Sequence, residues 1–409
     1  MKQLIKSAII VEKGNPLNGQ KKDIFIEDGI ITKIEDNIQD DADEVLDYPN
    51  TYVSIGWFDF RANFRDPGNE HQETIESGIK AAVNGGFTAV GLMPQKNPAT
   101  DNKSSIEYIL KQSEKFPVNI YPYGCLSENA EGKEIAEMYD MQQAGAKAFT
   151  DGKHAVSNLN LLERALRYAA NINSLILYFP NQKDLFDNGQ INEGVVSTKL
   201  GLKGIPSIAE TVAVKQAIAL AEYCETDIHF MGVSLSESIK EIKKHNKTTD
   251  IAAYQFYFTD DDLTEFDTNL KTLSPLRTKE NRNELIELLN SGDIDIICSD
   301  HEPREPEQKF REFDHASYGM INNQTFFGSL RYATKNTVSL ENLIATFTTN
   351  PRKRLNLKVP SIKIGQKADL TIFDPDLEWT FSEKENLSKS KNSPYFNKPL
   401  TGKALKTII

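Results

Sequence analysis

The feature that most constrains the fold of this chain is a regular alternation between short apolar runs and longer amphipathic stretches, from residue 53 to about residue 345. Such an alternation is typical of repeated βα units that build a parallel sheet. We identify eight candidate strands, at residues 53–58, 87–93, 118–123, 146–150, 175–178, 228–231, 254–258 and 294–298. Eight units predict a (β/α)8 TIM barrel, whose functional side chains lie at the carboxyl ends of the strands.

Both ends of the chain have a different pattern. Residues 1–52 read as short strands separated by turns, for example 23–34 with Gly29 in the bend, and strands return at 367–374 and 404–409 after Asn350-Pro351. We therefore predict an α/β chain in which residues 1–52 and 346–409 form one small β-sandwich domain beside a barrel of residues 53–345. A Ser/Lys/Asn-rich stretch at 388–393 is expected to be a surface loop.

Composition excludes several classes of partner. The chain has 409 residues, a formal net charge of -12 and a pI near 5.2, which argues against nucleic acid because phosphate backbones attract clustered Lys and Arg. No apolar segment is long enough to span a bilayer, and the N-terminal apolar run is too short for a signal peptide. The cysteines Cys125, Cys224 and Cys298 lack metal-type spacing, which favours a reducing compartment. We expect a cytoplasmic protein with no membrane or nucleic-acid partner.

The first predicted barrel strand ends in an unusual polar sequence. It reads Gly56-Trp57-Phe58-Asp59-Phe60-Arg61-Ala62-Asn63-Phe64-Arg65-Asp66-Pro67-Gly68, which is similar to the metal-binding strand of a hydrolase. Such a strand carries His-x-His for zinc, but Arg61 and Asn63 occupy those two places here. Neither a guanidinium nor a carboxamide replaces a neutral imidazole on zinc. A hydrolase fold is therefore predicted without its usual metal ligands.

Further motifs support a specific resemblance. In chain order they are Arg65-Asp66-Pro67-Gly68, Glu73-Thr74-Ile75-Glu76-Ser77-Gly78, Gly85-Gly86-Phe87-Thr88, Met93-Pro94, Asn192-Glu193-Gly194, Ser197-Thr198-Lys199-Leu200-Gly201-Leu202, Gly204-Ile205-Pro206, Phe266-Asp267-Thr268-Asn269, Ser274-Pro275-Leu276-Arg277, Ser299-Asp300-His301-Glu302-Pro303 and Lys389-Ser390-Lys391-Asn392. In this order and spacing, the chain resembles the dihydroorotases of the amidohydrolase superfamily, of the type that also occurs within multifunctional pyrimidine complexes. The resemblance implies a zinc hydrolase that interconverts dihydroorotate and N-carbamoyl-L-aspartate.

The resemblance also implies where the metal ligands should lie. The family pattern has His-x-His on the first strand, a carboxylate or carbamylated lysine after the fourth, histidines on the fifth and sixth, and an aspartate on the eighth. In this sequence the corresponding positions fall on Arg61, Asn63, Asp151, Tyr178, Gly232 and Asp300. Four imidazoles are absent. Asp300 matches the family's general base, and we expect it not to perform that role here.

The positions that the resemblance implies for substrate binding are also altered. Arg65 matches an arginine that grips the substrate carboxylate, for which its planar fork is suited. Gln95 stands where asparagine is usual, and Arg304 replaces a histidine. A structural role for Arg65, paired with Asp66 or Asp59, remains an equal alternative.

The histidines that are present do not fill the missing positions. His71, His154, His245 and His315 fall in predicted helices or loops away from the strand ends, so we expect them on the surface. His229 is expected in the core, and His301 is expected to brace the end of the eighth strand. Cys298 lies within Ile296-Ile297-Cys298 and is expected to pack in the core rather than act as a nucleophile.

The replacement pattern suggests a physical role for Arg61. Asp59, Asp151 and Asp300 are expected to crowd around an empty metal position, where unpaired carboxylates are costly. We therefore hypothesise that the Arg61 guanidinium takes the place of the metal and pairs with Asp300. The alternative is that Arg61 points to solvent and the carboxylates face water.

Three functions remain open from the sequence. We expect a non-catalytic dihydroorotase-like protein without a cofactor, which forms a homo-oligomer and is a structural or regulatory partner of aspartate carbamoyltransferase. The alternative is an active dihydroorotase, or a related cyclic-amide hydrolase, with an atypical zinc site. A third possibility is a sensor that uses Arg65 to bind a carboxylate metabolite without turnover.

Overall fold

A ring of parallel strand segments forms the larger part of the computed structural model, which describes residues 1–409. Seven segments are regular strands: β6 (Trp57–Ala62), β7 (Phe87–Leu92), β8 (Asn119–Pro122), β9 (Leu177–Tyr178), β12 (His229–Phe230), β13 (Thr248–Ala252) and β14 (Ile296–Cys298). The fourth place in the ring is taken by Phe149, which bridges Gly124 on one side and Ile176 on the other. A parallel bridge from Ala62 to His301 closes the barrel.

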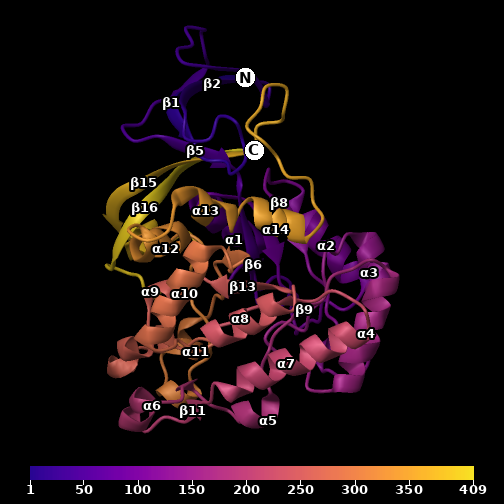
Figure 1. The fold of residues 1–409 in the computed structure, drawn as a ribbon. Coiled ribbons are helices and arrows are strands. Elements are labelled where there is room, and N and C mark those ends of the chain that lie inside the picture. Colours follow the sequence, from indigo (N-terminus) through magenta and orange to yellow (C-terminus); the bar gives the residue numbers. More distant parts are fainter.

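Amphipathic helices cover the outside of the barrel (Figure 1). The longer ones are α1 (Ile75–Asn84), α2 (Lys103–Ser113), α3 (Met138–Ala144), α4 (Leu159–Asn171), α7 (Ile208–Tyr223), α8 (Ser236–Lys244), α10 (Lys279–Ser291) and α12 (Phe326–Thr334), followed by α13 (Leu340–Ala345) and α14 (Thr349–Arg354). Shorter segments are α5 (Lys183–Phe186), β10 (Ile191–Asn192), α6 (Val195–Leu200), β11 (Gly204–Ile205), α9 (Tyr254–Tyr257) and α11 (Pro306–Lys309). In α4, the buried residues Leu161, Leu162, Ala165, Leu166 and Ala169 share one face.

Two apolar layers hold the barrel together. The larger lies between strands and helices, and the smaller fills the barrel interior with side chains that include Phe58, Phe60, Tyr123, Leu177 and Met231. The interior is therefore packed rather than open, as in other barrels of this kind. Apart from a few buried polar side chains within strands, such as Asp59 and Asp250, the polar groups therefore lie in the loops and at the strand ends.

Both chain ends lie in one β domain at the top of Figure 1. Its strands are β1 (Lys2–Ile10), β2 (Lys21–Glu27), β3 (Ile30–Glu35), β4 (Glu44–Leu46), β5 (Tyr52–Ile55), β15 (Leu370–Thr380) and β16 (Pro399–Ile408). They pair in the order β16-β15-β5-β1-β2-β3, with β4 on β1. Gly29 makes the β2–β3 turn with φ of +77°, a region that glycine enters without steric cost. The predicted fold class, a barrel with a terminal β domain, is confirmed.

Three predicted barrel strands need correction. The run at 53–58 is divided, because β5 pairs with β15 in the β domain and the barrel strand starts at Trp57. The run at 146–150 makes only the single bridges of Phe149. The run at 254–258 is helix α9, and the seventh strand is the more polar segment β13 just before it.

Two further expectations concern loops and membranes. Residues 388–393 are not a free surface loop, since Ser390 and Asn392 are buried and Ser390 donates to the Gln72 carbonyl at 2.8 Å. Ser390 therefore fastens this segment to the loop that precedes α1. None of the helices combines the length and the apolar character needed to cross a membrane.

Candidate functional site at the mouth of the barrel

A cavity of about 440 Å³ opens where the barrel strands end. Its lining comes from the segments that follow β6, β7, β8, Phe149 and β14, and it includes Arg61, Asn63, Arg65, Gln95, Lys96, Asp151, Lys153, His154, Asp300, Glu302 and Arg304. This is the end of a (β/α)8 barrel at which binding and catalytic residues gather. The cavity is therefore the candidate functional site.

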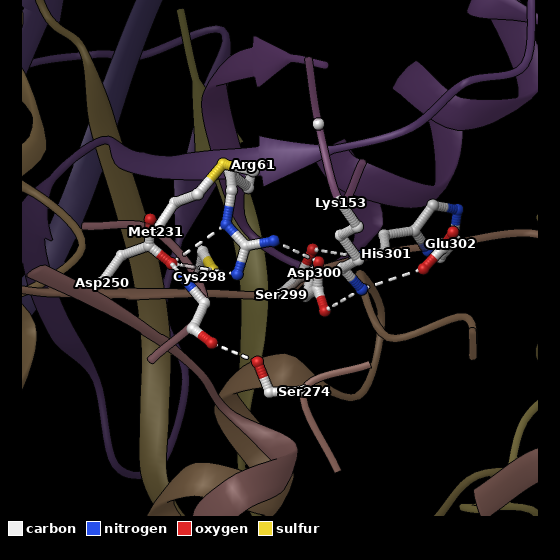
Figure 2. Close-up of polar contacts among 12 residues, drawn as sticks. Arg61, Lys153, Met231, Asp250, Ser274, Cys298, Ser299, Asp300, His301 and Glu302 are labelled. Atoms are coloured by element: carbon white, nitrogen blue, oxygen red, sulfur yellow. Dashed lines mark hydrogen bonds and ion pairs between the residues drawn. The ribbon is translucent and has the colours of Figure 1, made fainter. Parts of the chain in front are cut away.

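Arg61 lies at the base of this cavity and is only 1% exposed. Its Nε donates to Asp250 Oδ1 at 2.9 Å, and its Nη1 donates to Asp300 Oδ1 (Figure 2). Nη2 also lies 2.9 Å from Asp250 Oδ1, but its geometry makes no hydrogen bond. Burial opposes the charge of Arg61, yet the two carboxylates outweigh it and hold the pKa of the guanidinium well above its usual value. Arg61 thus points inward, not to solvent.

Asp250, at the centre of β13, is the partner that the sequence did not reveal. It accepts a hydrogen bond from the Gly232 backbone N–H at 2.9 Å and lies 3.2 Å from His229 Nε2. Burial raises the pKa of Asp250, but Arg61 and then His229 reverse this effect and bring the pKa down to about 2. Asp250 is therefore a fixed anion beneath Arg61.

Alternating charges continue from Asp300 toward the solvent. Lys153 Nζ donates to Asp300 Oδ2 at 2.7 Å and to Glu302 Oε2 at 2.9 Å. Glu302 Oε1 in turn accepts from Arg65 Nη2 at 3.1 Å and from Arg304 Nη2 at 2.6 Å. Burial raises the pKa of Glu302, but Lys153, Arg304 and Arg65 hold it well below its usual range. Every carboxylate in this chain of contacts faces at least two cationic groups.

Sequence reasoning also missed Lys153, Tyr254 and Glu302. The Tyr254 hydroxyl donates to Asp300 Oδ2 at 2.7 Å, from the first turn of a helix that was expected to be a strand. Lys153 follows the predicted fourth-strand carboxylate by two residues, so a search for cations near vacant metal positions would have found it. Glu302 was visible only as part of a motif.

Asp59 and Asp151 do not take part in the cluster around Arg61, contrary to expectation. Asp59 accepts from the Ser299 N–H at 2.9 Å and from Asn323 Nδ2 at 2.8 Å, and burial raises its pKa to about 6. Asp151 accepts from the backbone N–H of Leu126 at 2.9 Å and of Ser127 at 2.8 Å. Both carboxylates fasten loops through local hydrogen bonds.

The fifth-strand position needs a correction. Tyr178 packs edge-on against Phe230, with ring centroids 6.1 Å apart, in the layer beneath the helices. Phe179 instead faces the barrel interior. A Cβ built on Gly232 would lie 3.4 Å from both the Phe179 ring and Arg61 Nη2. From this strand Phe179, and not Tyr178, therefore faces the barrel interior, because successive side chains point to opposite faces of a strand.

The predicted recognition positions all line the cavity. Arg65 pairs with neither Asp66 nor Asp59, since its Nε donates to the Pro303 carbonyl at 3.2 Å and its Nη2 to Glu302. Arg304 Nε donates to the Tyr318 carbonyl at 2.8 Å. The side chain of Gln95 is 5% exposed and makes no hydrogen bond within the protein. Gln95 and the free Nη1 groups of both arginines are thus available to a ligand.

The buried histidines have structural partners. His301 Nδ1 accepts from the Asn322 N–H at 3.1 Å, and its Nε2 lies 3.4 Å from Glu73, which confirms that it braces the strand end. His229 is buried and its Nδ1 lies 2.8 Å from the Thr248 hydroxyl, as expected for a core residue. His154 is exposed at the rim of the cavity. Cys298 is fully buried, as predicted.

The donor atoms of this site do not fit a metal ion. No group of three or more His, Cys, Asp or Glu side chains is arranged to hold one. Arg61 carries N–H donors and no free lone pair, and it occupies the space between the two buried carboxylates of the cluster. A cation added there would meet a guanidinium instead of a ligand.

Comparisons with known proteins agree with this architecture. A family model described as Dihydro-orotase-like matches residues 52–238, and one described as Amidohydrolase family matches residues 207–409. The solved structure of the L-hydantoinase (dihydropyrimidinase) from Arthrobacter aurescens superposes on this chain with a TM-score of 0.86 at 21% identity. The match covers 99% of this chain and 94% of the hydantoinase chain. At this identity the likeness concerns the fold alone.

Sequence relatives are closer. The chain is 35% identical to the protein named Dihydroorotase from Syntrophotalea carbinolica, covering 100% of this chain and 98% of the relative. It is 36% identical to the protein named Dihydroorotase from Carboxydothermus hydrogenoformans, covering 100% and 96%. With the motifs, the barrel and the terminal β domain, these full-length matches lead to one conclusion. The chain belongs to the dihydroorotase family of the amidohydrolases.

Proposed function

We propose that this protein is a non-catalytic member of the dihydroorotase family, located in the cytoplasm, that acts as a structural or regulatory partner of aspartate carbamoyltransferase. The observation that carries the first part is the position of Arg61, whose guanidinium pairs with Asp250 and Asp300 at the base of the cavity. In a non-catalytic protein the guanidinium of Arg61 has a structural role, because it neutralises these two buried carboxylates. The partner is inferred from the family resemblance.

The loss of metal chemistry follows from the types of residue at the strand ends. The family pattern implies imidazoles where this chain has Arg61, Asn63, Tyr178 and Gly232. Phe179, the neighbour of Tyr178 that faces the barrel interior, is not an imidazole either. Zinc in a hydrolase needs several neutral nitrogen or anionic oxygen ligands and one open position for water. Asp300 does not serve as a general base here, because Arg61, Lys153 and Tyr254 already occupy its oxygens.

The test is the ring opening of dihydroorotate by the purified protein, measured with added zinc and again after chelation. The dihydroorotase from Carboxydothermus hydrogenoformans is the control for assay conditions. We expect no turnover in either condition from protein whose folded state is verified by its melting temperature. Turnover that chelation abolishes would overturn the proposal.

A second candidate function is an active dihydroorotase, or related cyclic-amide hydrolase, with an atypical metal site. The observation in its favour is that the full-length relatives at 35% and 36% identity carry that name. This candidate requires that Arg61 leave the cluster when metal binds. It predicts zinc-dependent activity that increases when Arg61 is removed, whereas the non-catalytic proposal predicts no activity in Arg61→Ala.

The proposed partner is tested by co-purification with aspartate carbamoyltransferase from the same organism. Binding should survive Asp300→Ala, provided that the variant is folded, because the binding surface is expected away from the cavity. Failure of the unaltered chain to bind the carbamoyltransferase would remove the partner and leave the loss of catalysis as a separate proposition.

A further inference from the structure

The cavity at the barrel mouth is positively charged, although the chain as a whole has a formal net charge of -12. Five cationic side chains and three carboxylates line it, an excess of two positive charges. They are Arg61, Arg65, Lys96, Lys153 and Arg304, against Asp151, Asp300 and Glu302. A cleft lined by one sign of charge raises the local concentration of ions of the opposite sign. The cavity therefore attracts anions.

The carboxylates of this cavity are already engaged by the protein. Asp151 accepts from two backbone N–H groups and from the Ser127 hydroxyl at 2.5 Å. Asp300 and Glu302 each accept three hydrogen bonds from other side chains. A ligand cation would have to compete with lysine and arginine for these oxygens. The groups that remain for a ligand are hydrogen-bond donors.

Gln95 supplies one such group, a buried amide without a partner in the protein. Only 5% of Gln95 is exposed, and its side chain lines the cavity without making a hydrogen bond. Its backbone is fixed, because its N–H donates to the Thr100 hydroxyl at 3.0 Å and its carbonyl accepts from the Thr100 N–H at 3.1 Å. A buried amide that lacks a partner is costly, and a ligand in the cavity would provide one.

Lys96, the next residue, supplies a cation that the protein does not neutralise. Its side chain is exposed, lines the cavity and makes no ion pair. The other four cations of the lining each pair with one or more of Asp250, Asp300 and Glu302. Lys96 can therefore pair with a ligand without disturbing the buried cluster.

Arg65 and Arg304 each keep one guanidinium nitrogen free. Their Nη2 atoms donate to the same oxygen of Glu302, whereas neither Nη1 makes a hydrogen bond. The two guanidinium groups repel each other, and burial followed by the charge of Arg304 lowers the pKa of Arg65 to about 10. An anion that accepts from the Nη1 groups would reduce this repulsion.

These free donors come from three neighbouring strands of the ring. Arg304 follows β14, Arg65 follows β6, and Gln95 and Lys96 follow β7. β6 pairs with β7, and the bridge from Ala62 to His301 joins β6 to the segment after β14. The donors thus occupy adjacent positions around the mouth, and a cavity of about 440 Å³ has the size of a small-molecule site.

We propose that this cavity binds a small dianionic metabolite, one that bears two carboxylates or a phosphate. Gln95, Lys96 and the Nη1 groups of Arg65 and Arg304 donate to its oxygens. Two negative charges match the excess of two positive charges in the lining. The inference rests on the proposed function in one respect, which is that the ligand is held without turnover.

The experiment is titration calorimetry of the purified full-length chain with succinate and with inorganic phosphate, at low ionic strength and about pH 8, where both probes are doubly charged. Acetate is the monoanionic control. We expect one or both dianions to bind at a single site, about tenfold or more tightly than acetate, because additional charge-assisted hydrogen bonds form. The two probes distinguish a dicarboxylate from a phosphate ligand.

Two variants test whether the dianion binds in this cavity. Lys96→Gln should weaken binding about tenfold, because one charge-assisted hydrogen bond is lost, and Gln95→Leu should also weaken it. Lys111→Gln is the matched control, since Lys111 is an exposed lysine of α2 that makes no ion pair. It should bind the dianion like the unaltered chain. Melting temperatures establish that all variants are folded.

Several results would overturn the dianion site. They are absence of binding by both dianions, acetate binding as tight as theirs, and a dianion affinity that is unchanged in both Lys96→Gln and Gln95→Leu. An equal loss of affinity in Lys111→Gln would also overturn it. The ring-opening assay tests the proposed function separately, because turnover of dihydroorotate would refute the loss of catalysis whether or not succinate or phosphate binds.

Discussion

Arg61 Nε lies 2.9 Å from Asp250 Oδ1, so a side chain from the first barrel strand reaches past the eighth and pairs with the seventh. β14 stands between β6 and β13 in the ring, and Arg61 also donates to Asp300 just beyond it. One guanidinium thus fastens the two ends of the chain's barrel segment. In a barrel, this is the seam at which the first and last strands must meet.

Removing this guanidinium should destabilise the protein markedly. Arg61→Ala leaves Asp250 and Asp300 buried with less compensation, and breaking one side of a buried ion pair costs about 3 to 5 kcal/mol. We expect a clear decrease in melting temperature by calorimetry. Arg164→Ala, which removes an exposed arginine 3.8 Å from Glu134, should change it little. An unchanged melting temperature in Arg61→Ala would refute the structural role of Arg61.

Neutralising the whole cluster should cost less than removing the arginine alone. In the triple variant Arg61→Met, Asp250→Asn, Asp300→Asn, no buried charge is left unpaired between these positions. Replacing complete buried ion pairs by neutral groups is often tolerated, and residues in direct contact are strongly non-additive. We expect the triple variant to melt above Arg61→Met. A lower melting temperature would mean that the carboxylates stabilise the fold independently of Arg61.

Stability in acid should reflect Asp250. The pKa of Asp250 is about 2 in the folded protein against an ordinary 3.8. Its contribution to the free energy of unfolding is therefore fully present above pH 3.8 and is lost as the pH falls through about 2. The difference in melting temperature between the unaltered chain and Asp250→Asn should therefore shrink from pH 5 toward pH 2.5. A difference that widens over this range would contradict the pairing.

Zinc should not stabilise this protein. A metal bound only by the folded state at 100 times its Kd would add about 2.7 kcal/mol. We expect the melting temperature to be the same with added zinc and after chelation, since the site lacks a set of ligands. A zinc-dependent increase that disappears in Asp300→Ala would reveal a metal site that includes that carboxylate.

Much of the architecture was predictable because apolar runs mark barrel strands whose side chains fill the interior. The exception is the seventh strand, β13. It reads Thr248-Thr249-Asp250-Ile251-Ala252, and its central residue Asp250 pairs with Arg61, so a search for apolar runs does not detect this strand. The apolar run after it belongs to α9, which packs against α12.

The candidate site was foreseen in part for the same reason. Arg61 and Asp300 follow apolar strands that were recognised, so their pairing was a testable hypothesis from the sequence. Asp250 was not foreseen because its strand was not recognised. The predicted position on the fifth strand, Tyr178, is one residue away from Phe179, the residue that faces the interior next to the short strand β9. In a strand, a shift of one residue reverses which side chain faces the interior.

The absent side chain at Gly232 determines the order in which this site can change. A histidine there would start with its Cβ 3.4 Å from Arg61 Nη2 and would require a backbone φ of +65°, which side chains other than glycine rarely adopt. Arg61 and an imidazole at 232 therefore compete for one volume. Replacing Arg61 first, however, leaves two buried carboxylates without their guanidinium. Each single substitution toward an imidazole at this position is therefore expected to destabilise the fold, so changes at positions 61 and 232 are energetically coupled.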